Sequence, residues 1–524
     1  MKGQQISMKK LVKQEKILLF LMTILFVLLN IFVICQKVNL HVDEVYTYGL
    51  ANHPYVDTFN MDPEEGRTYE PGGEAWDEYM QVQDGHAFDY GNVWTNQEAD
   101  VHPPFYYILV HTISSLFPGQ YSIWFAGSVN VVFAAFTFLL VFFLGRELSG
   151  RNRQAFAIAG FFMVTAGILS AAAFMRMYIV AMFWVTFVSY LMVRWQDRKR
   201  GVCFYLLLFA GSVLGALTHY YFLIYLFFLC CVWGVGLLIK KQYADVVKFL
   251  ATMALSGLSA LAVFPAMVQH ILSGHRGTEA MANLKDASAS DYLERLSIFF
   301  GYINRQIFGG LLPVFAVLLA AAIVLSWKKK RHWDNHPKVW LLLLPCLAYF
   351  ILVSKIAAYS YDRYIQPIYP VVVILGGYMI CYVCGKLSLK KVTAHCTMAV
   401  LAVTAALGLF RCQWEYLYRE SESLLEQAEK HAGSQCIYIY DWAWKAQPSF
   451  YEARNYESVT FISQDHLELL DEMELEEDGI VLCIMDTCEQ EPVLEKLESC
   501  YGGALSKETI GQYFFSTSYY IYRQ

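Results

Sequence analysis

The chain has little charge for its length. Of its 524 residues only 16% are Asp, Glu, Lys or Arg, whereas 56% are hydrophobic. A soluble globular domain has about 25% charged residues. The shortage therefore excludes an ordinary soluble enzyme and places the chain among membrane proteins. The net charge of -6 is mild, so the composition indicates no nucleic-acid partner.

Several common signatures are also missing. The chain has no internal repeat and no low-complexity segment. Its 13 cysteines lie mostly in apolar runs and lack the spacing of a disulfide framework. The Cys381-x-x-Cys384 pair has no second pair, which makes a zinc site a weak interpretation. The segment "YGGALS" lacks the nucleotide fingerprint G-x-G-x-x-G. We expect no cofactor and no metal; an acidic loop could hold a divalent ion, but it lacks EF-hand spacing.

Long apolar runs are what the sequence does contain. A membrane-spanning helix needs roughly 17–25 such residues. The clearest runs are residues 17–35, 123–144, 156–169, 174–193, 204–217, 221–239, 249–268, 299–327, 339–353, 367–383 and 398–410. The pattern predicts a multi-spanning α-helical membrane protein with about 11–13 spans. The first run is too long for a signal peptide and no cleavage site follows it, so we expect a retained anchor.

The basic residues of the short loops predict the orientation. They gather in the N-terminal tail and in residues 146–153, 194–200, 240–241, 328–331 and 386–391, and such loops stay in the cytoplasm. We therefore expect residues 1–16 to form a cytoplasmic tail and residues 17–412 to form a domain in a bacterial cell membrane. Residues 36–102 would form an outer loop of this domain. Residues 105–117 are short for a span. We expect them to lie along the outer interface or to dip in and return.

The tail after Arg411 has the pattern of a soluble domain. "RESESLLEQAEKHAG" predicts a helix that ends near Gly433. "CIYIYDW", "SVTFIS", "GIVLCIMDT" and "YFFSTSYYIYRQ" predict strands. Helical stretches lie between them, which indicates a small extracytoplasmic α/β domain over 413–524. Its role could be a lid, an acceptor platform or purely structural.

Polar residues of the apolar core nearly all fall at the predicted outer face, where ionisable side chains are candidates for function. They are Asp43, Glu44, His102, Arg176, Tyr178, Thr218, His219, Tyr220, Asp362 and Arg363. Each has an ordinary explanation too. Arg176 could extend to the lipid headgroups, His219 could be a hydrogen-bonded core histidine, and Asp43 could be the polar end of a helix. Their shared position on one face favours a single site.

These residues stand in motifs that resemble a known family. The motifs are "VDEVYTYGLA", "DVHPPFYYILVH", "AAAFMRMYIVAMF", "LGALTHYYFLIYLF" and "YDRYIQPIYPVVVIL", within residues 18–375. They are similar to those of the family 39 glycosyltransferases, which have the GT-C fold and include the protein O-mannosyltransferases and the aminoarabinose transferases of lipid A. The resemblance implies transfer of a sugar from a polyprenyl-phosphate donor at the outer face. It also implies a catalytic pair of Asp43, the general base, and Glu44, with His102 facing the lipid phosphate.

The chemistry of such a transfer gives the other residues roles. A base must take the proton of the acceptor hydroxyl, and cations must hold the departing phosphate. Arg176 and Arg363 suit the phosphate because a guanidinium can bind two oxygens at once. One essential carboxylate implies inversion at the anomeric carbon. We expect support from Tyr178, His219, Tyr220 and Asp362.

Two matters stay open in the sequence. The acceptor could be a protein hydroxyl, a wall polymer of the cell envelope or a glycolipid. The function could instead be transport or flipping of a lipid-linked sugar, or that of a non-catalytic scaffold or sensor. Transporters tend to show internal repeats and helices broken at mid-membrane, which this sequence does not show.

Overall fold

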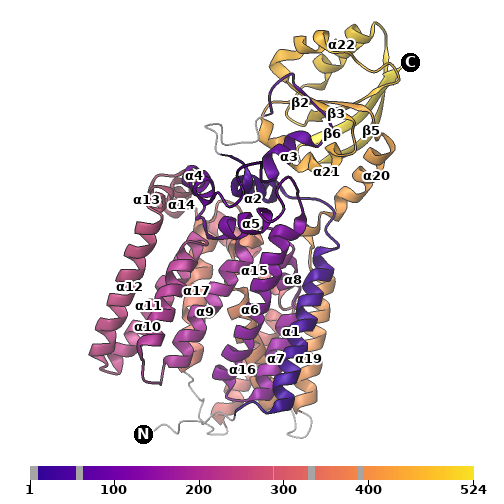
Figure 1. Ribbon diagram of the computed structural model, residues 1–524. Helices are drawn as coiled ribbons and strands as arrows, with labels where there is room; N and C mark the ends of the chain where they lie inside the picture. Colours follow the sequence, from indigo (N-terminus) through magenta and orange to yellow (C-terminus); the bar gives the residue numbers. More distant parts are fainter. Residues whose placement is uncertain (1–9, 55–62, 287, 329–336, 388–392) are drawn as a thin grey trace.

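The computed structural model describes residues 10–54, 63–286, 288–328, 337–387 and 393–524. It shows a tall helical bundle with a smaller sheet domain beyond one end (Figure 1). We call this the outer end of the bundle.

Eight described helices are long and apolar enough to cross a membrane. They are α1 (Lys13–Ile34), α6 (Ile123–Ser149), α9 (Tyr178–Trp195), α11 (Tyr220–Ile239), α12 (Tyr243–Val263), α17 (Pro337–Ile356), α18 (Tyr369–Leu387) and α19 (Thr393–Arg411). A bent pair, α7 (Asn152–Met163) with α8 (Ala166–Ala172), can form one more span. The shorter apolar helices α10 (Val202–Ala216) and α16 (Leu312–Lys328) run beside them. By length and composition the described helices give eight spans, or nine with the bent pair, and a count of 11 would also need these two shorter helices. The chain is an integral membrane protein.

The burial of the helices fits a bundle in lipid. α9 lies at the centre and contacts α6, α10 and α11, so most of its side chains are buried. α1 instead exposes Phe20, Leu28 and Phe32, and α12 exposes Val247 and Leu258. Exposed apolar faces of this extent mark contact with a membrane or a partner.

The apolar run at 299–327 is not one span. The chain breaks between α15 (Ala289–Gln306) and α16 at Gly309 and Gly310, which both have positive φ. A Cβ on Gly309 would lie 2.7 Å from the carbonyl oxygen of Thr404, so this close turn favours glycine. Arg411, the last residue of α19, donates a hydrogen bond of 2.9 Å to the Gly309 carbonyl. The end of α15 is therefore fixed against the outer end of α19.

The first outer loop forms a layer across the outer end. α2 (Val42–Asn52), α4 (Tyr90–Ala99) and α5 (Phe105–Ser114) contact one another there, and α5 lies under α2 rather than crossing the bundle (Figure 1). This agrees with the expectation for residues 105–117. The other short helices are α3 (Glu74–Met80), α13 (Ala266–Leu272), α14 (His275–Lys285), α20 (Glu422–Lys430), α21 (Phe450–Ala453) and α22 (Gln490–Tyr501). The 3₁₀ turns are η1 (Asp362–Tyr364), η2 (Gln366–Ile368), η3 (Glu415–Leu417), η4 (Arg419–Ser421), η5 (Ala443–Ser449) and η6 (Gln464–Glu472).

The outer domain contains a six-stranded sheet in the order β1-β3-β2-β4-β6-β5. Its strands are β1 (Thr68–Tyr69), β2 (Gln435–Tyr440), β3 (Ser458–Ser463), β4 (Ile480–Met485), β5 (Leu505–Tyr513) and β6 (Ser516–Arg523). β2, β3 and β4 are parallel, and β5 with β6 forms an antiparallel hairpin beside β4. The α/β class is as expected from the tail. The stretch "YFFSTSYYIYRQ" is not one strand, because it contains the turn of this hairpin, and β5 was not expected.

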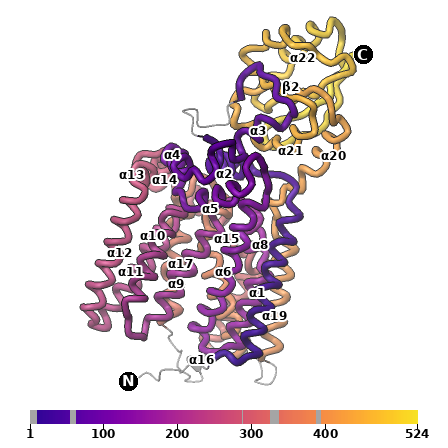
Figure 2. Tube along the Cα trace, viewed as in Figure 1, coloured from indigo at the N-terminus to yellow at the C-terminus, as the bar shows by residue number. Residues whose placement is uncertain are grey.

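One strand of the sheet comes from outside the tail. β1 belongs to the first outer loop and pairs with β3, with Thr68 opposite Thr460. The domain boundary at 413 therefore leaves out part of the sheet. The loop fixes the domain elsewhere too: Trp76 Nε1 donates to the Gln447 carbonyl at 3.2 Å and Tyr513 OH to the Leu40 carbonyl at 2.9 Å. Figure 2 shows this loop reaching from the bundle into the sheet domain.

The structure gives a testable orientation. Arg176, directly before α9, and Asp362, in η1, lie at the end of the bundle next to the sheet domain. Arg146 lies in the last turn of α6, at the opposite end. Thr218 and Arg200 are buried, as are Arg176 and Asp362, so more open neighbours provide the test. Because basic short loops remain in the cytoplasm, single cysteines at His102, Asp84 and Lys285 should label from outside, and single cysteines at Arg146 and Arg151 only from inside. Lys329, also expected inside, lies beyond the described residues.

The labelling needs a background without native cysteines. With position 102 outside, labelling of position 146 from outside together with labelling of position 285 from inside would invert the later part of the scheme. It would also require 105–117 to cross the membrane.

Candidate functional site

The site starts at the first turn of α2, at the outer end of the bundle. His41 caps this helix: its Nδ1 accepts a hydrogen bond of 3.0 Å from the Asp43 amide. Glu44 Oε2 accepts one of 2.8 Å from the His41 amide, which completes a capping box. Carboxylates in the first turn also favour the positive end of the helix dipole. Neighbouring residues on a helix point about 100° apart, so Asp43 and Glu44 face different surroundings.

Asp43 faces the basic residues of the site. Its Oδ2 lies 2.8 Å from a terminal nitrogen of Arg363, and the two side chains are 26% and 10% exposed. Burial alone would raise the pKa of Asp43. The charge of Arg363, with a smaller contribution from that of Arg176, holds this pKa well below the ordinary range. Asp43 is therefore a carboxylate at any physiological pH, partly open to solvent and paired with a guanidinium.

Arg176 lies between α8 and α9 and is almost fully buried. One terminal nitrogen donates to the Asp43 carbonyl at 3.1 Å, Thr47 Oγ1 at 3.2 Å and Tyr107 OH at 3.0 Å. The other meets only His102 Nε2, at 3.4 Å. Its Nε has no hydrogen-bond partner among the described residues. One edge of the guanidinium fork is thus fixed to α2 and α5, while the other edge is largely unused.

His102 contacts the second terminal nitrogen of Arg176, and its ring is neutral. Its Nδ1 lies 2.7 Å from Asp100 Oδ2. A carboxylate only accepts hydrogen bonds, so Nδ1 carries the proton and Nε2 accepts from Arg176. Burial lowers the pKa of His102 and outweighs the opposing charge of Asp100. In this arrangement His102 positions Arg176 and offers no cation of its own.

Glu44 has a separate environment. It is fully buried, its Oε2 lies 2.8 Å from Lys37 Nζ, and its Oε1 accepts from the Met175 amide at 2.7 Å. Lys37 is equally buried and lies over the ring of Tyr418, with Nζ 4.7 Å from the ring centre. Burial raises the pKa of Glu44, against the charge of Lys37 and these hydrogen bonds. Glu44 is therefore paired with a buried cation and does not share the partly open surroundings of Asp43.

Arg363 is held by its own turn. Asp362 accepts hydrogen bonds from Gln306 at 2.8 Å, from Gln366 at 3.3 Å and from Tyr416 OH, and it is buried. The guanidinium of Arg363 lies 4.9 Å from the ring centre of Tyr361 and 5.5 Å from that of Tyr364. Asp362 therefore positions the η1 turn, and Arg363 presents its charge to Asp43.

The remaining predicted residues divide into two groups. Tyr178 and His219 lie behind the arginines, with ring centres 5.3 Å apart, and the His219 ring lies 6.4 Å from that of His102. Tyr220 points elsewhere: its OH lies 2.7 Å from His270 Nδ1, and His270 Nε2 lies 3.1 Å from the Glu98 carbonyl. Tyr220 thus joins α11 to α13 and the outer loop, outside the cluster.

The sequence interpretation missed some members of the cluster. Lys37, Asp100, Tyr107 and Tyr418 were not predicted as site residues. A signal existed for Lys37, the last strong base before the Asp-Glu pair. No group of three potential metal ligands occurs among the described residues.

Acidification should destabilise this outer face. Burial lowers the pKa of His41 to about 4, whereas an unfolded histidine has a value of about 6.5. A histidine with a lowered pKa stabilises the fold above about pH 6.5, and this contribution is lost as the pH falls below it. At pH 5 the loss is about 2 kcal/mol for His41. Asn is also a good N-cap, so His41→Asn should keep the helix and remove this titration.

The measurement is Tm at pH 7.5 and pH 5.0 for the wild type and His41→Asn. The wild type should lose more between the two values than the variant. Equal losses would contradict a buried neutral ring at His41. Asp43 does not interfere, because its low pKa makes its contribution disappear only below about pH 4.

The fold has solved relatives. No known family profile matches the sequence, and no characterised protein matches it in sequence. The chain is similar in structure to ArnT from Cupriavidus metallidurans bound to undecaprenyl phosphate, with a TM-score of 0.51 and 12% identity over 95% of this chain and 97% of ArnT. The same protein in the apo state gives a TM-score of 0.52, also with 12% identity and the same coverage. This confirms the GT-C fold; the narrower assignment to family 39 stays a prediction.

Proposed function

We propose that this chain transfers a sugar from a polyprenyl-phosphate donor to an acceptor hydroxyl at the outer face of the membrane, with inversion. The observation that carries the proposal is the joint placement of Asp43, Arg363 and Arg176, whose Nε has no partner among the described residues, at the outer end of a GT-C bundle. An ArnT of the same fold binds undecaprenyl phosphate. Such a transfer needs a carboxylate beside guanidinium groups, which this site provides.

The two arginines would receive the donor phosphate. Arg176 offers its Nε and one terminal nitrogen, the edge that can bind two phosphate oxygens. Arg363 can bind the phosphate as well as Asp43, because its pair with Asp43 is partly open to solvent. As the bond between the anomeric carbon and the phosphate oxygen breaks, negative charge grows on the phosphate. Cations already in place stabilise that charge without reorganisation.

Donor binding would also activate the base. A carboxylate held ionised by Arg363 attracts a proton weakly. When Arg363 turns its charge to the phosphate, the pKa of Asp43 rises toward its ordinary value. Asp43 then takes the proton of the acceptor hydroxyl as the acceptor oxygen bonds to the anomeric carbon. This coupling makes the base effective only when the donor is present.

Loss of either arginine should weaken donor binding. Arg363→Ala and Arg176→Ala should each raise the Kd for undecaprenyl phosphate by roughly 10–100-fold, because a hydrogen bond to a charged group contributes about 1.5–3 kcal/mol. Lysine keeps the charge but loses the planar fork, so Arg363→Lys and Arg176→Lys should also be impaired. Arg198→Ala is the matched control, since Arg198 pairs with Glu147 at the opposite end of the bundle. Unchanged binding in both alanine variants would place the phosphate elsewhere, with Lys355 or Arg67 the next to test.

A genetic experiment tests the proposal and identifies the sugar. A strain that lacks the protein should lose one sugar from its surface glycans, as detected by mass spectrometry. Wild-type protein should restore it, and Asp43→Asn should not. Restoration by Asp43→Asn would instead favour a protein that only moves the lipid-linked sugar.

A further inference from the structure

The carboxyl ends of the parallel strands in the outer domain lie on the side of the sheet that faces the candidate site. We call this side the edge of the sheet. β2 ends at Tyr440 and is followed by Asp441 and Trp442, and its neighbour β4 ends at Met485. From β2 the chain continues to β3 on one side, and from β4 to the hairpin on the other. In open α/β sheets, ligands bind beyond the carboxyl ends of parallel strands at such a switch point. The hairpin turn lies at the same edge, since the Asp486 amide donates to the Phe515 carbonyl at 2.8 Å.

Aromatic rings connect this edge to the catalytic candidate. The ring centres of Trp444 and Phe515 lie 5.3 Å apart, those of Phe515 and Phe514 5.8 Å, and those of Phe514 and His41 5.6 Å. His41 is the cap of α2, and its Nδ1 is 3.7 Å from Asp43 Oδ2. The rings therefore form a continuous line from the sheet to the carboxylate.

Two large rings at this edge are open to solvent. Trp442 is 63% exposed and Phe514 is 44% exposed. Phe514 also has a φ of 32°, a region that a residue with a side chain rarely adopts. Such a conformation persists only where the surroundings impose it, and it is concentrated at functional sites. The hairpin thus holds Phe514 in place beside His41 rather than burying it in the core.

Polar groups accompany these rings. Lys445 Nζ lies 2.7 Å from Asp441 Oδ2, Thr487 Oγ1 donates to the same oxygen at 2.6 Å, and the Trp442 amide donates to Asp441 Oδ1 at 2.8 Å. Asp441 and Thr487 are exposed. This edge therefore offers hydrogen-bond donors and acceptors beside aromatic faces, with opposite charges in balance.

We propose that this edge, formed by Asp441, Trp442, Lys445, Thr487 and Phe514, is a subsite that binds a neutral carbohydrate acceptor. The inference rests on the proposed function, because it places the acceptor next to Asp43. A sugar ring has an apolar C–H face and a rim of hydroxyls, which match exposed aromatic rings beside Asp, Lys and Thr. A peptide acceptor fits less well, because peptides commonly add a strand to an open sheet edge. The proposed subsite lies at the ends of strands and not along the open side of an outermost strand.

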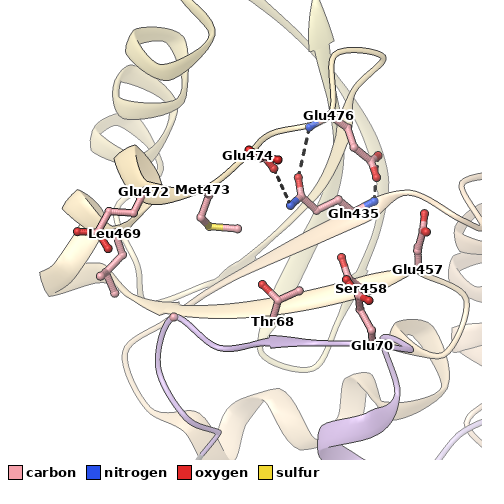
Figure 3. Close-up of a pocket in the computed structure, with 11 residues that line it drawn as sticks. Thr68, Glu70, Gln435, Glu457, Ser458, Leu469, Glu472, Met473, Glu474 and Glu476 are labelled. Atoms are coloured by element: carbon pink, nitrogen blue, oxygen red, sulfur yellow. Dashed lines mark hydrogen bonds between the residues drawn. The ribbon is translucent and has the colours of Figure 1, made fainter.

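The opposite edge of the same sheet provides a control surface. A cleft there lies between the first residues of β2 and β3 and is lined mainly by glutamates (Figure 3). The side-chain amide of Gln435 already donates to the Glu474 carbonyl at 3.2 Å and accepts from the Glu476 amide at 3.4 Å. Met473 lines this cleft.

The test uses the full-length protein in lipid nanodiscs. The probes are neutral hexasaccharides of glucose, mannose and N-acetylglucosamine, observed by saturation-transfer NMR. At least one should receive saturation on its ring C–H protons. Trp442→Ala and Phe514→Ala should each raise its Kd roughly tenfold or more, because central aromatic residues dominate binding. Trp442→Phe and Phe514→Tyr should largely restore binding, and Met473→Ala should not change it.

Three outcomes would overturn the subsite: no hexasaccharide of the panel binds, binding is unaffected in both alanine variants, or a Ser/Thr peptide binds at this edge in place of sugar. Undecaprenyl phosphate binding and donor turnover, measured on the same preparations, separate the two proposals. A protein that turns over the donor but ignores the sugars keeps its proposed function and loses this subsite. A protein that binds the sugars at this edge but does not use the donor loses the proposed function.

Discussion

Asp43→Asn should lower sugar transfer by roughly 10²–10⁴-fold, the usual contribution of a general base. The substitution keeps the size of the side chain and an oxygen that can accept from Arg363, but it removes the group that takes the proton. Donor affinity should be unchanged or higher. The lost interaction belongs to the transition state, and Arg363 no longer divides its charge between Asp43 and the phosphate.

The measurement is turnover and donor Kd on one purified preparation, with Tm as a check of folding. Asp197→Asn is the matched control, because Asp197 pairs with Lys240 at the far end of the bundle. Near-normal turnover in Asp43→Asn would remove the base from α2. A parallel loss of donor binding would instead give Asp43 a role in the ground state.

Lys37→Met should be the most destabilising single change at the site. It would leave Glu44 buried without its cation, and breaking a buried pair from one side costs about 3–5 kcal/mol. We expect a decrease in Tm of roughly 5 °C. The double variant Lys37→Met/Glu44→Gln should recover much of this loss, because no unpaired charge remains. Glu44→Gln alone should lower Tm less than Lys37→Met does, but it still leaves Lys37 without a carboxylate.

The pH dependence of Lys37→Met provides a second check. Burial raises the pKa of Glu44, and in this variant no lysine opposes it. A carboxyl group with a raised pKa destabilises the fold as the pH rises above its unfolded value of about 4.3. The difference in Tm between the wild type and the variant should therefore narrow from pH 7.5 to pH 5.5. A double variant as unstable as Lys37→Met would show that Lys37 acts through something other than Glu44.

The sequence was sufficient for the fold class and for the end of the bundle at which the candidate residues gather. Apolar run lengths predicted the spans, and the order of the spans brought Asp43, His102, Arg176 and Arg363 to one end. That inference needs only the fact that successive spans cross the membrane in opposite directions, so it does not depend on side-chain detail. Failures occurred where a run was continuous in composition but interrupted in backbone, as at Gly309.

Side-chain direction was beyond the sequence. Asp43 and Glu44 look alike in "HVDEVYTY", yet one meets Arg363 and the other Lys37. Their partners come from distant segments, and only the packing of α2 decides which carboxylate faces which cation. Tyr220 was predicted in the site because it belongs to the motif "LGALTHYYFLIYLF" at the predicted outer face, but a helical step turns it toward His270. β1 was missed because a two-residue strand has no periodic pattern.

Turnover of a labelled lipid-linked sugar is the most direct test of the central claim. The purified protein in sealed vesicles would be given undecaprenyl phosphate that carries a radiolabelled hexose or aminoarabinose, together with an envelope extract of the strain that lacks the protein as the source of the acceptor. With at least one donor, the label should leave the lipid and free undecaprenyl phosphate should accumulate, at a rate that Asp43→Asn reduces by roughly 10²-fold or more. Donors that bind but remain intact, or that only cross the vesicle membrane, would contradict a transferase and indicate a carrier of lipid-linked sugars.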